Sequence, residues 1–324
     1  MNVIPPATVT RAGLSPDTIR RSAVAVALLI VLAIGTARSP DFLAVENVMN
    51  VLRQNAVLAL IALGMTVVII GGGIDLSVGS VLALTSVVAV KLVAVSIPLA
   101  LIVPVALGAV IGLGNGLIVA RLKIAPFIAT LATLLALRGL TIAAFGEETV
   151  PLTDGRAAFM AFGRATVAGI PVQVPIVIVA ALAVAFVLGF TRFGRAVHAV
   201  GGNEHSARLL GLRVDRVKVM IYVISGALAG GAGALFAARI GAGITNYGLG
   251  LELDAITAVA LGGTLLTGGV GGVGGTLLGV LLIGFLFNLF NLDATLDPFL
   301  QKVVRGLLLT LVVVLQGVVA RKRT

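Results

Sequence analysis

The sequence lacks cysteine and tryptophan altogether, and its 324 residues include only two tyrosines and two histidines. Without cysteine the chain makes no disulfide bond and has no thiol nucleophile. Two histidines with no cysteine beside them do not supply the ligands of a structural zinc site. Charged residues are also scarce, at 11% of the chain, against about a quarter of a typical soluble domain. These shortages exclude a disulfide scaffold, a disordered chain and an ordinary soluble enzyme.

Motifs for nucleotide and hydrolytic chemistry are missing as well. The chain contains no G-x-x-x-x-G-K-[ST] sequence, so we expect it not to hydrolyse a nucleotide by itself. A formal G-x-G-x-x-G occurs at Gly269, Gly271 and Gly274, but it lacks the strand–turn–helix unit and the acidic residue of a dinucleotide site. The sequence therefore predicts a protein that is not an enzyme and has no cofactor.

Apolar residues make up 59% of the chain, and its mean hydropathy is +1.17. Apolar runs of this density indicate helices that span a membrane, each of about 20 residues. We therefore predict an all-α polytopic membrane protein of about ten transmembrane helices, including short and glycine-broken ones. The expected spans are residues 22–37, 56–72, 74–90, 97–119, 126–145, 174–190, 218–238, 253–268, 275–291 and 299–318.

The net charge of +10 is distributed as a topology signal rather than as a nucleic-acid-binding patch, because the basic residues separate the apolar runs. With the N-terminus inside, most lysine and arginine residues fall in inner segments, and both termini are cytoplasmic. We interpret the first apolar run as an uncleaved helix, since no good signal-peptide cleavage site follows it. The predicted parts are a cytoplasmic segment 1–21, a transmembrane domain 22–318 with a cytoplasmic loop 191–217, and a basic cytoplasmic tail 319–324.

Residues 69–80 contain glycine and polar residues in the middle of an apolar region. Three glycines, Gly71–Gly73, precede Asp75 and Ser77 between two apolar runs. One interpretation is a tight turn in which Asp75 and Ser77 cap the helix that follows. The other is a break near the membrane interior whose polar groups line a path, since an acidic residue at membrane depth is costly and usually faces a cavity. The two interpretations are compatible.

Residues 191–217 form the longest inner segment and contain both histidines. Gly201–Asn203 is a turn signal, and we expect Glu204–Leu210 to form a short helix that is capped by Asn203 and ends at Gly211. Such a helix on the inner face would be a docking surface for a soluble partner. The alternative is a solvated basic loop that only fixes the topology.

Small and polar residues inside the apolar runs give two further expectations. Gly108 and Gly112, like Gly226 and Gly230, have the spacing that lets membrane helices pack closely, and we expect them to pack within the chain. Arg138 lies inside a predicted span. Its side chain either reaches back to the outer membrane surface or takes part in pairing or in a pathway.

Three segments resemble the ribose-type sugar permeases of ATP-binding cassette importers. They are GMTVVIIGGGIDLSVGS (Gly64–Ser80), GRAVHAVGGNEHSARLLGL (Gly194–Leu212) and LELDAITAVALGGTLLTGGVGG (Leu251–Gly272). Their order and spacing agree with that family, and the resemblance extends from about Phe42 to Gln316. The GGIDLSVG run is similar to the sugar branch rather than to the branched-chain amino acid permeases. ELDAI followed by GGTLLTGG resembles the second permease of galactofuranose-type importers.

The resemblance implies a permease in the lipid of the bacterial cytoplasmic membrane that pairs with a copy of itself or with a paralogue. Two ATPase subunits of the ATP-binding cassette type would dock on its cytoplasmic side. An extracytoplasmic sugar-binding protein would deliver a monosaccharide, a pentose or a hexose, to its outer face. The residues that match the family's coupling segment, which contacts the ATPase, are Gly201, Gly202, Asn203, Ala207, Arg208 and Gly211.

For the translocation pathway we expect a weakly polar cavity, lined mostly by small residues, that leaves selectivity to the binding protein. The polar residues expected along the pathway are Asp75, Ser77, Asn115, Asn288 and Asn291. The alternative function is a self-sufficient secondary transporter coupled to an ion. Proteins of that class hold ions at broken helices, and Asp75 is the acidic residue nearest to the predicted break.

Overall fold

The computed structural model describes residues 16–153, 156–292 and 297–321 of the chain. Most of the predicted segment 1–21 and the last three residues of the predicted tail 319–324 lie outside the described residues. Within the described residues the chain forms thirteen α-helices, one 3-10 helix and four short strands. The prediction of an all-α architecture is therefore confirmed in its main point, because the strands are only two or three residues long.

Ten of the helices overlap the ten predicted spans, although the eighth of them ends at Leu261 whereas its predicted span extends to residue 268. They are α1 (Pro16–Arg38), α2 (Val45–Ile70), α3 (Val78–Val93), α4 (Ile97–Arg121), α5 (Pro126–Phe145), α7 (Gln173–Phe190), α10 (Val214–Ile240), α11 (Leu251–Leu261), α12 (Val273–Leu292) and α13 (Pro298–Arg321). Among the described residues, six helices are long and apolar enough to cross a membrane: α2, α4, α5, α7, α10 and α12. That all ten cross it stays a prediction.

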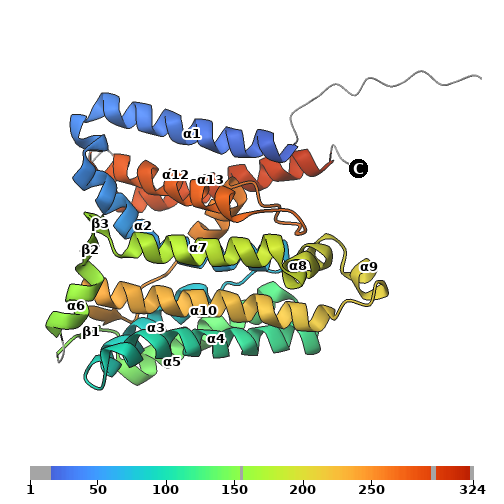
Figure 1. Ribbon diagram of the computed structural model, residues 1–324, viewed down its shortest axis with the longest axis horizontal. Coiled ribbons are helices and arrows are strands. Elements are labelled where there is room, and N and C mark those ends of the chain that lie inside the picture. Colours follow the sequence, from blue (N-terminus) through green and yellow to red (C-terminus); the bar gives the residue numbers. More distant parts are fainter. Residues whose placement is uncertain (1–15, 154–155, 293–296, 322–324) are drawn as a thin grey trace, which may run out of the picture.

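The remaining elements lie at the two ends of the helix bundle (Figure 1). One end carries α8 (Arg192–Gly202) and α9 (Glu204–Leu209), and it is also the end where α1 begins and α13 finishes. The opposite end carries η1 (Pro40–Leu43), α6 (Arg156–Arg164) and two small hairpins. In these, β1 (Thr149–Pro151) pairs antiparallel with β4 (Ala242–Ile244), and β2 (Thr166–Val167) pairs with β3 (Ile170–Pro171).

α2 and α10 form the centre of the bundle. Every residue of α2 from Ala56 to Ile70 is buried, and α10 packs against α2, α3 and α4. A helix that is apolar on all sides is expected to be enclosed by other helices. α5 and α7 lie further out and expose large apolar side chains such as Leu135 and Phe186, which suits contact with lipid.

α4 and α10 approach each other through glycine. Gly108 faces Gly226 and Gly230, and Gly112 faces the backbone of Tyr222. A Cβ atom at either position on α4 would collide with a carbonyl oxygen of α10. Small residues four apart allow this contact between helix backbones. The expectation that these glycines pack within the chain is confirmed.

Two non-helical segments separate a long buried helix from a shorter one. α2 ends at Ile70 and α3 begins only at Val78, whereas the sequence predicted that the helix resumes at residue 74. The carboxylate of Asp75 accepts a hydrogen bond from the backbone N–H of Ser77 at 3.1 Å, which keeps the chain in a turn over these residues. The second break follows α10 and ends where α11 begins.

The two breaks share a sequence pattern, and the second break contacts the first turn of α3, the helix that follows the first break. Residues 70–75 read IGGGID and residues 240–245 read IGAGIT. A Cβ atom at Gly79 would collide with the carbonyl oxygen of Gly248, so the backbones touch at this point. α11 has 11 residues, a length of about 16 Å, and does not cross a membrane alone. The prediction of a short, broken eighth span is confirmed.

Candidate functional site

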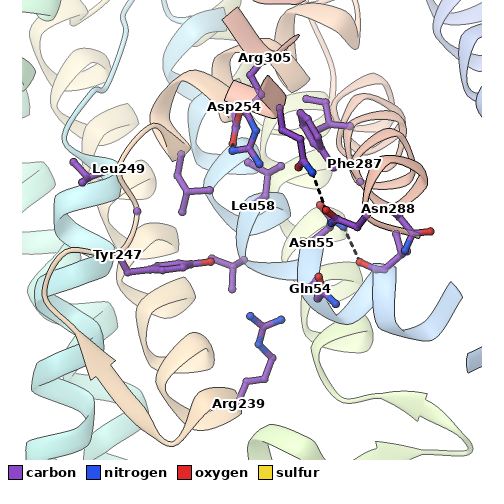
Figure 2. Close-up of a pocket in the computed structure, with 18 of the residues that line it drawn as sticks. Gln54, Asn55, Leu58, Arg239, Tyr247, Leu249, Asp254, Phe287, Asn288 and Arg305 are labelled. Atoms are coloured by element: carbon purple, nitrogen blue, oxygen red, sulfur yellow. Dashed lines mark hydrogen bonds and ion pairs between the residues drawn. The ribbon is translucent and has the colours of Figure 1, made fainter. Parts of the chain in front are cut away.

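A cavity of about 580 Å³ lies between α2, the segment that joins α10 to α11, and helices α11, α12 and α13 (Figure 2). It is formed where α2 and α13 begin and where α10 and α12 end, which is the end of the bundle opposite α8 and α9 (Figure 1). Its volume is typical of small-molecule sites, which span about 300–1,000 Å³. Its polar lining residues are Gln54, Asn55, Arg239, Asn246, Tyr247, Asp254, Asn288, Asn291, Gln301 and Arg305.

An ion pair joins two walls of this cavity. Oδ2 of Asp254, in the first turn of α11, lies 2.6 Å from Nη1 of Arg305 on α13. The Asp254 side chain is only 8% exposed, and a charge so buried is stable when a partner of opposite sign accompanies it. The guanidinium of Arg305 lies over the ring of Phe287, 4.3 Å from its centroid, in a cation–π contact. Figure 2 shows Asp254, Arg305 and Phe287 on one side of the cavity and Arg239 on the other.

Amide side chains on α12 are held by two further pairings. Asn288 and Asn47 exchange hydrogen bonds of 2.9 and 3.0 Å. Nε2 of Gln301 donates to Oδ1 of Asn291 at 2.8 Å. Two of the five predicted pathway residues, Asn288 and Asn291, therefore line the cavity.

Arg138 supports the wall that contains Tyr247. Its Nη1 donates to the carbonyl oxygens of Thr245 at 2.8 Å and Tyr247 at 2.9 Å. The ring of Tyr247 stacks on Phe236, with the centroids 3.9 Å apart. Of the two interpretations of Arg138, pairing is therefore the one that the structure shows, and the partners are carbonyls of the second break.

The other three predicted pathway residues, Asp75, Ser77 and Asn115, form a separate buried network. Oγ of Ser77 donates to Asp75 at 2.6 Å and accepts from Nδ2 of Asn115 at 2.9 Å. Ser225 donates to the other carboxylate oxygen of Asp75 at 2.8 Å, and Thr133 donates to Oδ1 of Asn115 at 2.6 Å. The expected cap is present only in part, because the hydroxyl of Ser77 makes no capping bond to α3. This network ties α3, α4, α5 and α10 together, and none of its members lines the cavity.

The sequence did not reveal most of the cavity. The expected pathway, weakly polar and lined mostly by small residues, stays a prediction; this cavity is lined by arginine, aspartate, tyrosine and amide side chains. The available signal was the presence of Asp254 and Arg305 inside apolar runs, since charged residues at membrane depth are rare and usually face a cavity.

The α8–α9 end carries an exposed tip. α9 spans Glu204–Leu209, and Oδ1 of Asn203 accepts a hydrogen bond from the Ser206 N–H at 2.9 Å, so the predicted capped helix is confirmed. Leu209 and Leu210 are 76% and 79% exposed. Arg208, beside them, is also exposed. We refer to Arg208, Leu209 and Leu210 as the α9 tip.

Other residues of the predicted coupling segment face different ways. Gly202 and Gly211 have nothing within 4 Å of the position where a side chain would begin. Gly201 instead packs against the carbonyl of Ile70 and the backbone of Gly269. Ala207 is 2% exposed and belongs to a core cluster of the permease itself. The segment is therefore divided between an outer surface and residues that hold it to the bundle.

An ion-pair network fastens α9 to α10. Glu204 receives hydrogen bonds from Lys218 at 2.6 Å and from Arg208 at 3.2 Å, and Arg208 also bonds Asp215 at 2.6 Å. Partial burial would raise the pKa of the Glu204 carboxyl, but the hydrogen bonds and charges of Lys218 and Arg208 outweigh it and hold the pKa below its usual value. The hydrogen bonds to Asp215 and Glu204 raise the pKa of Arg208 in turn.

Comparison with known proteins identifies the family of the chain. Residues 47–313 match the family described as branched-chain amino acid transport system / permease component. The ribose import permease RbsC of Haemophilus influenzae is 40% identical over 302 residues, which are 92% of this chain and 93% of that protein. RbsC of Bacillus subtilis is 43% identical over 290 residues, 89% of this chain and 90% of that protein. The L-arabinose ABC transporter permease AraH of Azospirillum brasilense is 36% identical over 297 residues, 91% and 87% respectively.

No solved structure matches the chain. A bundle of apolar helices with a polar cavity at one end and two broken helices is typical of an integral membrane permease. The chain belongs to the family of permease components of branched-chain amino acid transport systems. Its similarity to ribose and arabinose permeases over most of its length confirms the resemblance to the ribose-type branch. The closer likeness to galactofuranose-type importers stays a prediction.

Proposed function

We propose that the chain is the transmembrane permease subunit of an ATP-binding cassette importer that moves a monosaccharide, a pentose or a hexose, into the cell. The observation that carries this proposal is 40% identity over 92% of the chain to a ribose import permease. A second relative is named as an L-arabinose permease. The names of both relatives specify a pentose, and the polar cavity suits a ligand rich in hydroxyl groups.

Energy for transport comes from partner chains in this proposal, because the sequence contains no nucleotide-binding motif. The α9 tip supplies a docking surface for an ATPase subunit. Two exposed leucines give an apolar centre and Arg208 gives a charged edge, a combination typical of protein interfaces. Two such ATPases would serve a pair of permeases, which are either two copies of this chain or this chain and a paralogue.

The proposed topology places the α8–α9 end in the cytoplasm of a bacterial cell. The start of α1 and the end of α13 lie at the same end (Figure 1), which supports cytoplasmic termini and ten spans across the cytoplasmic membrane. The cavity then opens on the outer half, where an extracytoplasmic sugar-binding protein delivers its cargo. Asn288 and Asn291 line the first part of the pathway, and the Asp75–Ser77–Asn115 network braces the helices around it.

A secondary transporter would use Asp75 for ion coupling. Its carboxylate is already bonded by Ser77 and Ser225 and lies outside the cavity, which supports a structural role. We expect uptake by an Asp75→Asn variant to remain driven by ATP. Uptake that follows a proton gradient and is lost in this variant would favour the secondary transporter.

The experiment that tests the proposal is mass spectrometry of the proteins that copurify with the tagged chain in mild detergent. We expect an ATP-binding cassette ATPase in about equal amount, and a second permease if the pair is a heterodimer. Proteoliposomes that contain the complex are then expected to take up D-ribose or L-arabinose only when ATP is present in the lumen, which corresponds to the cytoplasm. Purification of the chain alone, under conditions that keep known cassette complexes intact, would contradict the proposal.

A further inference from the structure

We infer that the cavity is a recognition site for neighbouring sugar hydroxyl groups, centred on Asp254 and Arg305, so that the permease itself discriminates among monosaccharides. The inference rests on the proposed function, because it takes sugars as the transported class. It differs from the expectation drawn from the sequence, in which the permease is an unselective conduit and the binding protein alone chooses.

The Asp254–Arg305 pair has the chemistry that a vicinal diol requires. A carboxylate only accepts hydrogen bonds and has about four lone-pair positions, of which Arg305 uses one. A guanidinium only donates and has five N–H groups. Each sugar hydroxyl both donates and accepts. Two adjacent hydroxyls therefore satisfy both residues at once, with one donating to Asp254 and the other accepting from Arg305.

The pair is fixed before any ligand arrives. Arg305 is held between the carboxylate of Asp254 at 2.6 Å and the ring of Phe287 at 4.3 Å. Asp254 lies in the first turn of α11, and its backbone N–H donates to the carbonyl of Gly250 at 3.0 Å. A donor and an acceptor held in fixed positions favour sugars with one configuration at the two hydroxyls over their epimers. Little conformational entropy of the protein is lost on binding, because the pair is already ordered.

Other side chains of the cavity complete the site. Among the described residues, the side chains of Gln54 and Asn246 have no hydrogen-bond partner in the protein, although both line the cavity. Asn288 and Asn291 are already paired with other amides. Gln54 and Asn246 thus remain available for further hydroxyls of the ligand, whereas the amide pairs form a fixed polar wall. Figure 2 shows Gln54 facing the cavity from α2, across from Asp254 and Arg305.

The test is direct binding to the full chain in lipid nanodiscs, without binding protein or ATPase. The probes are D-ribose, L-arabinose and D-galactose, and saturation-transfer NMR detects binding in the millimolar range. The variants are Asp254→Asn and Arg305→Lys, which change the hydrogen-bonding groups at similar size, and Gln54→Ala, which removes no side-chain hydrogen bond within the protein. Matched controls are Asp41→Asn and Arg121→Lys, at two exposed positions outside the cavity.

We expect at least one probe to bind the unmodified chain. Asp254→Asn and Arg305→Lys should each weaken that binding about tenfold, since hydrogen bonds to charged groups are the stronger ones, and should change the affinity ratio between D-ribose and L-arabinose. Gln54→Ala should weaken binding less, and the two controls should leave it unchanged.

Two results would overturn the inference. The first is that none of the three sugars binds the unmodified chain. The second is that the cavity variants weaken the binding of all three sugars by the same factor and also lower the melting temperature of the protein. That result would mean that the ion pair only fastens α11 to α13. Neither result bears on copurification with an ATPase or on ATP-driven uptake, so the proposed function stands or fails separately.

Discussion

Gly201, near the end of α8, lies against the carbonyl oxygen of Ile70, the last residue of α2, and leaves no room there for a side chain. The same carbonyl accepts a hydrogen bond from the N–H of Gly269 at 2.8 Å. Nδ1 of His198 on α8 lies 2.9 Å from the carbonyl oxygen of Gly269. The α8–α9 end is thus in direct contact with the end of α2, whose first half lines the cavity. Because packed elements transmit strain, we expect a shift of α8 to act on α2, the helix whose first half lines the cavity.

The contact at Gly201 is testable by adding one methyl group. Gly201→Ala should destabilise the permease by about 1–3 kcal/mol, the usual cost of overpacking a close contact. It should also reduce transport at an unchanged level of ATPase docking, because the contact lies on the side of α8 that faces α2. Thermal unfolding in detergent and ATP-driven uptake measure the two effects. Gly189→Ala on α7 is the control, since its side chain would meet nothing within 4 Å and it lies outside the predicted coupling segment; equal effects of the two substitutions would contradict the role of the Ile70 contact.

The α9 tip gives a prediction about docking. Replacing both Leu209 and Leu210 by serine should leave folding unchanged, because the two side chains are more than three-quarters exposed, and should sharply reduce the amount of ATPase that copurifies. Val45→Ser, at an equally exposed position at the opposite end of the bundle, should not reduce it. Undiminished copurification with the double variant would show that the ATPase docks elsewhere.

Ala207 is not suited to the same test. The resemblance places Ala207 in the coupling segment that contacts the ATPase, but its side chain is buried among residues of the permease. A bulky substitution there would disturb the packing of α9 first, and any loss of the ATPase would follow from that. The sequence alone does not separate the two cases, because a small residue is equally suited to a tight interface and a tight core.

The sequence predicted the helices well because the local signal is strong. Long apolar runs separated by charged and glycine-rich segments located all ten helices, and Asn203 marked the start of α9. The end of the first break was misplaced because the apolar residues Ile74 and Leu76 were read as the start of the next helix, although the polar residues Asp75 and Ser77 alternate with them. Only the hydrogen bond from Ser77 to Asp75 shows that these residues remain a turn.

The cavity could not be predicted in the same way, because its parts are distant in the chain. Asp254 and Arg305 are 51 residues apart, and Asp75 and Ser225 are 150 residues apart. The sequence around each of these residues does not indicate which distant residue it will contact. Of the predicted pathway residues, the two asparagines of α12 line the cavity and the three around the first break do not. The presence of a polar residue inside an apolar run correctly indicated that its side chain has a buried partner. It did not show whether that side chain faces a ligand or only stabilises the fold.

Arg138 is predicted to hold the second break in place. Arg138→Met would leave the carbonyl oxygens of Thr245 and Tyr247 without their donor, at a cost of about 1.5–3 kcal/mol for hydrogen bonds to a charged group. The expected result is faster amide exchange in residues 242–250, measured by mass spectrometry, with α7 unaffected. Arg121→Met, at an exposed position, is the control. Unchanged exchange in residues 242–250 would mean that the stacking of Tyr247 on Phe236 suffices.

The network around Glu204 predicts a pH dependence for the attachment of α9. Because the pKa of Glu204 is held below its usual value, the carboxylate stabilises the folded network at every pH above the unfolded pKa, about 4.3. That contribution is lost only as the pH falls through the still lower folded pKa. Protection of the α9 amides, corrected for intrinsic exchange, should therefore be the same at pH 7.5 and pH 5.5.

Substitutions separate Glu204 from its neighbours in this network. Glu204→Gln should lower α9 protection at both pH values, whereas Asp215→Asn should lower it less, because the bonds of Glu204 to Lys218 and Arg208 remain. The effects should be small and should shrink in high salt, since the side chains of Glu204 and Arg208 are 42% and 44% exposed and surface ion pairs are screened. Loss of protection between pH 7.5 and 5.5 that occurs in the unmodified chain but not in the Glu204→Gln variant would instead indicate a raised pKa of Glu204, and would mean that its burial outweighs its two cationic partners.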